Sequence, residues 1–165
     1  MKRIHRTFTG RALMCSVLLW ASPAFADMEQ ARDLMEAGEF TQARALFEVY
    51  ARSGNAEAEE LIGVMYALGL GVAKNDVRAF DWYLRASLKG HPGAQSGIGW
   101  YYEVGRGLPA PDYVRAYLWY ALSAIGGDVD APDSLEELSP KLTAEQRALA
   151  EMLVNDYRVW MYPFR

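Results

Sequence analysis

Apolar residues along most of the chain are spaced three and four positions apart, as on one face of an α-helix. In the helix predicted over residues 56–68 this face is formed by Ala58, Ile62, Met65 and Tyr66. A second helix is predicted over residues 75–89. No segment alternates between apolar and polar residues over a useful length, so the sequence predicts an all-α fold without a β-sheet.

This pair of helices is encoded twice. Residues 56–91 are followed by a second copy, residues 92–128, in which the same residue types return 36 or 37 positions later. The shared positions are Gly63/Gly99, Tyr66/Tyr102, Gly69/Gly105, Gly71/Gly107, Ala79/Ala116, Trp82/Trp119, Tyr83/Tyr120 and Gly90/Gly127. Self-similarity at this period is typical of a solenoid, in which antiparallel helix pairs stack on one another.

The segments on either side of the two copies are interpreted as ends of the same solenoid. Residues 27–55 read as a degenerate first repeat of two helices. Residues 129–165 read as a linker, with at most one short turn at Leu135–Leu138, followed by a capping helix. Thr143 and Gln146 form a capping box at the start of this helix. Its expected packing stripe comprises Leu149, Met152, Leu153 and Trp160.

The first 26 residues have the pattern of a secretory signal peptide. Four basic residues precede a short apolar core, and Ala24 and Ala26 supply a small-x-small cleavage site. An uncleaved anchor is the rival interpretation, but the core has about half of the roughly 20 apolar residues that a spanning helix needs. The residues before Cys15 do not form a lipobox. We therefore expect cleavage after Ala26 and no stable membrane insertion afterwards.

Cleavage would change the charge and the cysteine content. The remaining 13 basic and 21 acidic residues carry a formal charge of −8. Such a chain offers little counter-charge to nucleic acid, so a nucleic-acid partner is not expected. The only cysteine, Cys15, lies in the signal segment, so the exported chain would have neither a disulfide nor a thiolate metal site.

The repeated motifs resemble the Sel1-like family, a bacterial relative of tetratricopeptide repeats. The first copy carries the resemblance in Ile62-Gly63, Met65-Tyr66, Gly69-x-Gly71 and Trp82-Tyr83, and the second in Ile98-Gly99, Gly105-x-Gly107 and Trp119-Tyr120. The resemblance implies an α-solenoid that binds proteins. Family members often carry an asparagine, which can bind a peptide backbone or carboxylate, before the Leu-Gly of the first helix. Both copies lack it, with Glu60-Leu61 and Ser96-Gly97 in those places.

The search for chemistry finds no catalytic motif, no phosphate-binding loop and no metal-ligand spacing, so we expect neither enzyme activity nor a cofactor. The histidine of the exported chain, His91, lies at the turn between repeats, where the resemblance implies a capping role. Glu57, Glu59 and Glu60 lie in the first turns of one helix, where carboxylates interact favourably with the helix dipole. Asp128, Asp130 and Asp133 lack the spacing of a calcium-binding loop.

The positions where the two copies differ are the candidates for function. Trp100 takes the place of Val64, and related repeats place this position on the concave face. Exposed tryptophan is over-represented among binding hot spots, although burial of Trp100 remains an alternative. The candidate partner-binding residues of this face are Glu57, Glu60, Val64, Ser96, Trp100 and Glu103.

The favoured hypothesis is a non-catalytic scaffold, exported to the periplasm, that binds a protein or peptide segment on its concave face. One alternative is an enzyme or binding protein that acts on cell-wall material, such as β-lactams or peptidoglycan. Another is a secreted factor that acts on a host or competitor cell.

Overall fold

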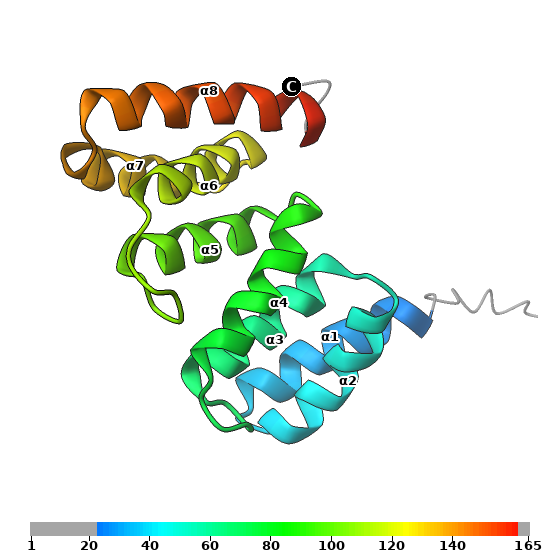
Figure 1. The fold of residues 1–165 in the computed structure, drawn as a ribbon. Helices are drawn as coiled ribbons and strands as arrows, with labels where there is room; N and C mark the ends of the chain where they lie inside the picture. The colour runs from blue at the N-terminus through cyan, green and yellow to red at the C-terminus, as the bar shows by residue number, and fades with distance from the viewer. Residues whose placement is uncertain (1–22, 162–165) are drawn as a thin grey trace, which may run out of the picture.

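The computed structural model describes residues 23–161, with side chains described for 28–158 and 161. Within this range the chain forms eight α-helices and one short 3₁₀-helix, and it contains no strand (Figure 1). In chain order these are α1 (Pro23–Glu36), α2 (Phe40–Arg52), α3 (Ala56–Leu68), α4 (Asp76–Leu88), α5 (Pro92–Val104), α6 (Tyr113–Gly126), α7 (Ala131–Leu138), η1 (Ser139–Lys141) and α8 (Ala144–Met161).

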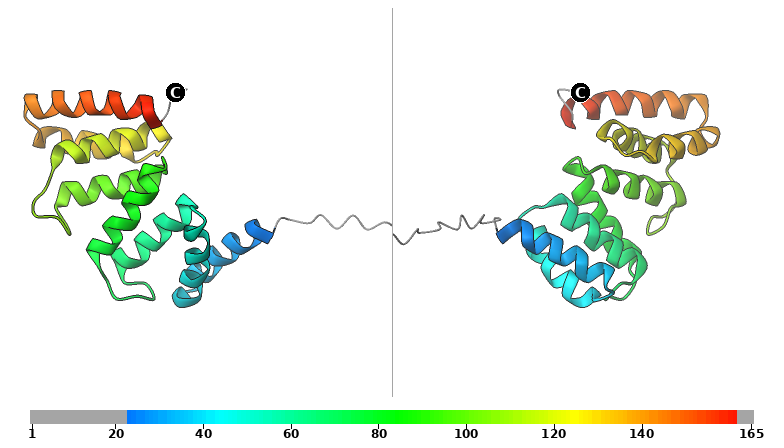
Figure 2. Two further views of the ribbon diagram at one scale, coloured as in Figure 1. Left: turned by 45° about the vertical axis from the view of Figure 1, so that its right-hand side comes forward. Right: turned by 180° about the vertical axis from the view of Figure 1, so that it is seen from behind.

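The helices stack in sequence order along one curved array. Each of α1 to α6 packs on its neighbours in the chain, α7 packs on α6, and α8 returns to cover α6. Figures 1 and 2 show α1 and α2 at one end of the array and α8 at the other. This architecture confirms the predicted α-solenoid of antiparallel helix pairs.

Polar caps explain where the helices of the two repeats begin. The Asn55 side chain accepts a hydrogen bond from the backbone N–H of Ala58 at 2.9 Å, and Asn75 and Asp112 cap α4 and α6 in the same way. His91 Nδ1 accepts from the backbone N–H of Ala94 at 3.3 Å, which confirms its capping role. Each cap satisfies one of the four N–H groups that a helix start leaves without a partner.

Glycines set the turns between the two helices of each repeat. Gly69 and Gly105 follow α3 and α5 in the left-handed conformation, with φ of 78° and 68°. A Cβ at position 105 would lie 2.7 Å from the backbone nitrogen of Pro111. Both the backbone angle and the close approach therefore require glycine at this position.

The repeated Gly–Tyr pairs form the contacts between helices. A Cβ at Gly63 would lie 3.3 Å from the ring of Tyr83, and one at Gly99 would lie 2.8 Å from the ring of Tyr120. Tyr83 and Tyr120 are buried. The absence of a side chain at both glycines lets a tyrosine ring from the second helix of the repeat lie against the backbone of the first.

The C-terminal region differs from the prediction in two ways. The expected linker contains the two-turn helix α7, whose Leu138 is fully buried against α6. In α8 the capping box of Thr143 and Gln146 is confirmed, but Leu149 and Met152 of the predicted stripe are about half exposed. The α8 residues that pack inward include Ala150, Leu153, Val154 and Met161.

The predicted signal peptide, residues 1–26, lies almost entirely outside the described residues, as does Cys15. The side chain of Trp160 lies outside them too. Of the helices in the described part of the chain, none combines the length and the apolar character needed to cross a membrane.

Candidate functional site

A pocket of about 400 Å³ opens between α3 and α5, the first helices of the two repeats. We call it the α3–α5 pocket. Val64 and Trp100 both line it. They occupy equivalent positions of the two repeats, and the residue type differs between the copies there. The full set of lining residues is Val64, Ala67, Leu68, Lys74, Tyr83, Gly97, Trp100, Tyr101 and Arg106. The structure therefore brings together two of the predicted site residues that are 36 positions apart.

Tyr83 links the pocket to the core because its ring lies between the two first helices. A Cβ at Gly97 would lie 2.9 Å from this ring, so the glycine lets α5 approach Tyr83 from the side opposite Gly63. Tyr101 contacts Tyr83 with ring centroids 5.8 Å apart. Burial, with a smaller contribution from Glu60, raises the pKa of the Tyr83 hydroxyl. The inner part of the pocket is thus aromatic and uncharged at neutral pH.

Trp100 stands at the mouth of the pocket and is 41% exposed. Its indole packs edge-to-face on Tyr101, with centroids 5.2 Å apart, and the Arg106 guanidinium lies 5.3 Å from the centroid of the indole ring. These contacts hold the ring in place without covering it. A positioned, half-exposed indole has the features of a binding hot spot.

Basic side chains line the end of the pocket nearest the C-termini of α3 and α5. Lys74 is exposed, and no described residue forms a hydrogen bond or ion pair with it. Arg106 Nε lies 3.7 Å from an Asp76 carboxylate oxygen. Sequence reasoning missed both residues because they come from the turns after α3 and α5, which it treated only as connectors.

Acidic side chains lie outside the pocket lining, in the first turns of α3. Glu57 forms an ion pair with Arg32 of α1, and buried Glu59 forms one with Lys89 at 2.6 Å. Glu60 is half-buried, and burial together with the charge of Glu57 raises its pKa to about 7. The three carboxylates that the sequence grouped as one cluster therefore have different surroundings.

The remaining two predicted residues are placed differently. Ser96 is half-buried on α5, one residue before Gly97 of the pocket. Glu103 accepts a hydrogen bond from the Tyr120 hydroxyl at 2.8 Å and forms an ion pair with Lys141 at 2.7 Å. Its carboxylate thus joins α5 to α6 and η1, and it is already engaged within the chain.

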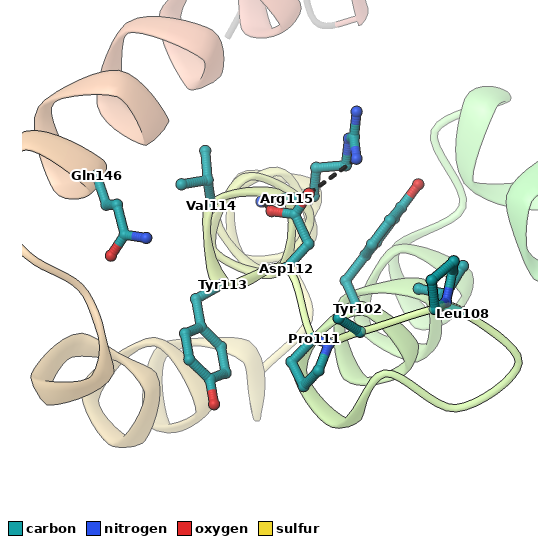
Figure 3. A pocket seen from close by; sticks show the side chains of 10 residues that line it. Tyr102, Leu108, Pro111, Asp112, Tyr113, Val114, Arg115 and Gln146 are labelled. Atoms are coloured by element: carbon teal, nitrogen blue, oxygen red, sulfur yellow. Dashed lines mark hydrogen bonds and ion pairs between the residues drawn. The ribbon is translucent and has the colours of Figure 1, made fainter.

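A second hollow of about 540 Å³ lies beside the α5–α6 turn (Figure 3). Its polar groups serve local structure. Asp112 caps α6 and pairs with Arg115 at 2.8 Å, and Gln146 completes the capping box with Thr143. Because these groups already have partners, this hollow offers fewer free groups to a ligand than the α3–α5 pocket does.

The lining of the α3–α5 pocket is mostly apolar and aromatic. Its lining includes no serine, cysteine, histidine or carboxylate, which are the groups that most often act as nucleophiles or general acids and bases. Among the described residues, no group of three or more His, Cys, Asp or Glu side chains is arranged to hold a metal ion. The pocket offers aromatic and aliphatic surface and two cations.

Comparisons with solved structures agree with the fold. A chain of c5321, a protective antigen present in uropathogenic Escherichia coli strains that displays an SLR fold, aligns with 85% of this chain. The TM-score is 0.78 and the identity 27%. A Sel1 repeat protein from Oxalobacter formigenes aligns with 69% of this chain, with a TM-score of 0.64 and 32% identity. The matches span only 31% and 46% of those two chains.

A family model matches both repeats of the sequence. The model of the Sel1 repeat matches residues 56–91 and again residues 92–128. No curated protein matches the sequence. The two repeat matches coincide with the helix pairs α3–α4 and α5–α6, whose first helices form the pocket. The chain therefore belongs to the Sel1 repeat family, as an all-helical solenoid with two complete repeats between residues 56 and 128.

Proposed function

We propose that this protein is a non-catalytic scaffold that binds a segment of a partner protein on the concave face, at the α3–α5 pocket. Sel1 repeat proteins generally mediate protein–protein interaction. The observation that carries the proposal is the half-exposed Trp100 at the mouth of a largely apolar pocket. A side chain of the partner would enter between Val64 and Trp100.

The size of the expected effect follows from the energetics of such contacts. Truncation of a hot-spot tryptophan typically costs about 2 kcal/mol or more of binding free energy, or roughly thirtyfold in affinity. The same truncation should change stability little, because the indole is 41% exposed and packs mainly on Tyr101 and Arg106. Binding and folding can therefore be separated at this residue.

Cross-linking in intact cells, followed by mass spectrometry, tests the proposal. Wild type should yield a partner peptide joined to this face, and Trp100→Ala should lose it while the melting temperature stays within a few degrees. Leu149→Ala on α8 is the matched control, since Leu149 is 45% exposed and lies far from the pocket along the chain. Unchanged recovery of the partner with Trp100→Ala would remove the pocket from the binding site.

Export to the periplasm is a second part of the proposal, supported by the basic head, apolar core and small-residue cleavage site of residues 1–26. Cell fractionation should recover the protein in the periplasm, with a mass that begins at Asp27. Recovery in the culture medium would instead favour a secreted factor, and an uncut N-terminus would contradict cleavage.

A further inference from the structure

Charges of opposite sign flank the α3–α5 pocket along the direction of α3. Glu60 lies on α3 one helical turn before Val64, which lines the pocket. Lys74 and Arg106 lie at the other end, after α3 and α5. Because both helices run in the same direction along the pocket, the acidic end coincides with their first turns and the basic end with their last turns.

At the acidic end, Glu60 has an unused carboxylate. A Cβ at Gly93 would lie 3.7 Å from Glu60 Oε1, so this oxygen faces the first turn of α5. No side-chain hydrogen bond or ion pair joins the Glu60 carboxylate to another described residue, whereas its neighbours Glu57 and Glu59 are paired with Arg32 and Lys89. A cation brought by a partner would supply what the chain does not.

The pKa of Glu60 supports this interpretation. Its value of about 7 reflects burial and the nearby charge of Glu57, both of which disfavour the ionised form. A carboxylate that is costly to ionise without a partner gains more from a bound ammonium or guanidinium group than an exposed one does.

At the basic end, the side chains of Lys74 and Arg106 carry more positive charge than the neighbouring carboxylate neutralises. Lys74 has no ion pair among the described residues, and Arg106 shares a long contact of 3.7 Å with Asp76. Tyr101, which lies beneath Trp100, also approaches Asp76 at 3.5 Å. Asp76 is thus paired with Arg106 and not with Lys74, and a net positive charge remains in a chain whose overall charge is negative.

We propose, building on the scaffold function above, that the pocket selects an internal partner segment in which a large apolar side chain is flanked by a basic residue on one side and an acidic residue on the other. The basic residue pairs with Glu60, the apolar side chain lies between Val64 and Trp100, and the acidic residue pairs with Lys74 and Arg106.

The length of α3 beside the pocket gives a lower bound on the spacing of the two charged residues. Glu60 and Ala67 are seven residues apart on α3, or about 10 Å along the helix axis. An extended segment covers this length in about three residues. A segment with two acidic flanking residues would place one of them against Glu60, and a segment with two basic ones would place one against Lys74. Both should bind more weakly, because like charges at an interface are unfavourable.

Four acetylated and amidated fluorescent peptides test the proposal by anisotropy. Each carries a leucine between two flanking residues that are three positions apart. The two flanking residues are Lys/Asp, Asp/Lys, Asp/Asp or Lys/Lys. At least one oppositely charged peptide should bind roughly fivefold or more tightly than both like-charged ones, which is the upper range for one exposed ion pair. Equal affinity for all four, or no binding by any below about 1 mM, would overturn the proposal.

Variants assign the ends. Glu60→Gln should weaken binding of the best peptide, and it should bind the Asp/Asp peptide without the penalty seen in wild type. Lys74→Gln should likewise bind the Lys/Lys peptide without that penalty. Glu151→Gln and Arg158→Gln on α8 are matched controls, since both residues are exposed on the terminal helix. Unchanged peptide preferences in both pocket variants would overturn the proposal.

The scaffold function is tested independently of these charges. If Trp100→Ala abolishes peptide binding but the affinity does not depend on the flanking charges, the charge selection is refuted and the scaffold function stands. Binding that depends on flanking charge but not on Trp100 would refute the apolar anchor, and with it the placement of the segment between Val64 and Trp100.

Discussion

At the scale of single residues, the tyrosine of each repeat fixes how closely the helices approach. Tyr83 contacts Gly63 and Gly97, and Tyr120 contacts Gly99. Gly63 and Gly99 recur at equivalent positions because a side chain at either would press on a buried ring. The same tyrosine that packs the core also forms the inner wall of the pocket.

The substitution Gly99→Ala tests this packing. The new Cβ would lie 2.8 Å from the Tyr120 ring, so the ring or the helix must shift, at a cost of about 1–3 kcal/mol in the free energy of unfolding. Urea denaturation measures the change. Gly93→Ala on the same helix is the control, because its nearest neighbour would be 3.5 Å away, and it should be neutral or slightly stabilising. Equal effects of the two substitutions would contradict this account of the packing.

Glu60 makes stability depend on pH. Its folded-state pKa of about 7 exceeds the ordinary 4.5, so folding takes up a proton between these values and the stabilising contribution is lost as the pH rises through 7. Relative to wild type, Glu60→Gln should therefore raise the free energy of unfolding more at pH 8 than at pH 5, by about 1–3 kcal/mol.

Denaturation of wild type and Glu60→Gln at both pH values measures this difference. Burial lowers the pKa of His91, and this opposes the trend of Glu60, but His91 is present in both proteins and so cancels. Glu57 and Tyr83, which also face Glu60, are unchanged as well. The same stability difference at pH 5 and pH 8 would argue against a titrating Glu60.

At the scale of elements, each helix of the two repeats has its own start and stop signals. Asn55, Asn75, His91 and Asp112 cap the four N-termini with a side-chain acceptor. Such signals act within a few residues of the chain, which is why the sequence placed the two helices of the first repeat within one residue of their observed bounds.

Removing a cap should cost a small and defined amount. Asn75→Ala loses the hydrogen bond to the Arg78 N–H and should destabilise the protein by about 1 kcal/mol. Asn75→Asp keeps an acceptor and adds a negative charge at the helix start, so it should retain wild-type stability. Thermal and urea unfolding distinguish the two; equal losses would show that the cap contributes nothing specific.

At the scale of the whole molecule, α8 covers the face of α6 that would otherwise end the solenoid. Leu153 and Val154 pack against the cluster that contains Trp119, and the Tyr157 ring meets Trp119 with centroids 6.4 Å apart. A terminal element of this kind is what a solenoid needs to cover its last apolar face.

A pair of adjacent substitutions tests which face of α8 packs. Leu153→Ala removes a side chain from the interface with α6 and should lower the free energy of unfolding by about 2 kcal/mol. Met152→Ala changes a residue that is 53% exposed and should be close to neutral. Urea midpoints at equal m-values measure both, and a comparable loss of stability in Met152→Ala would restore Met152 to the stripe predicted from sequence.

The sequence by itself determined the all-helical class, the two repeats, the helix limits of the first repeat and the capping box of α8, because each depends on local patterns in the chain. It also singled out Val64 and Trp100 as the positions where the repeats differ. Their meeting in one pocket could be anticipated because equivalent positions of stacked repeats lie on the same face.

Only the tertiary structure decided how distant groups combine. Lys141 engages Glu103 from 38 positions away, while Glu60 is left without a partner among the described residues, and Lys74 and Arg106 reach the pocket from two separate turns. In α8 the amphipathic pattern allowed neighbouring stripes, and the shape of α6 selected Ala150 and Leu153 over Leu149 and Met152. These outcomes depend on contacts between elements that are far apart in the chain, which no single helix encodes.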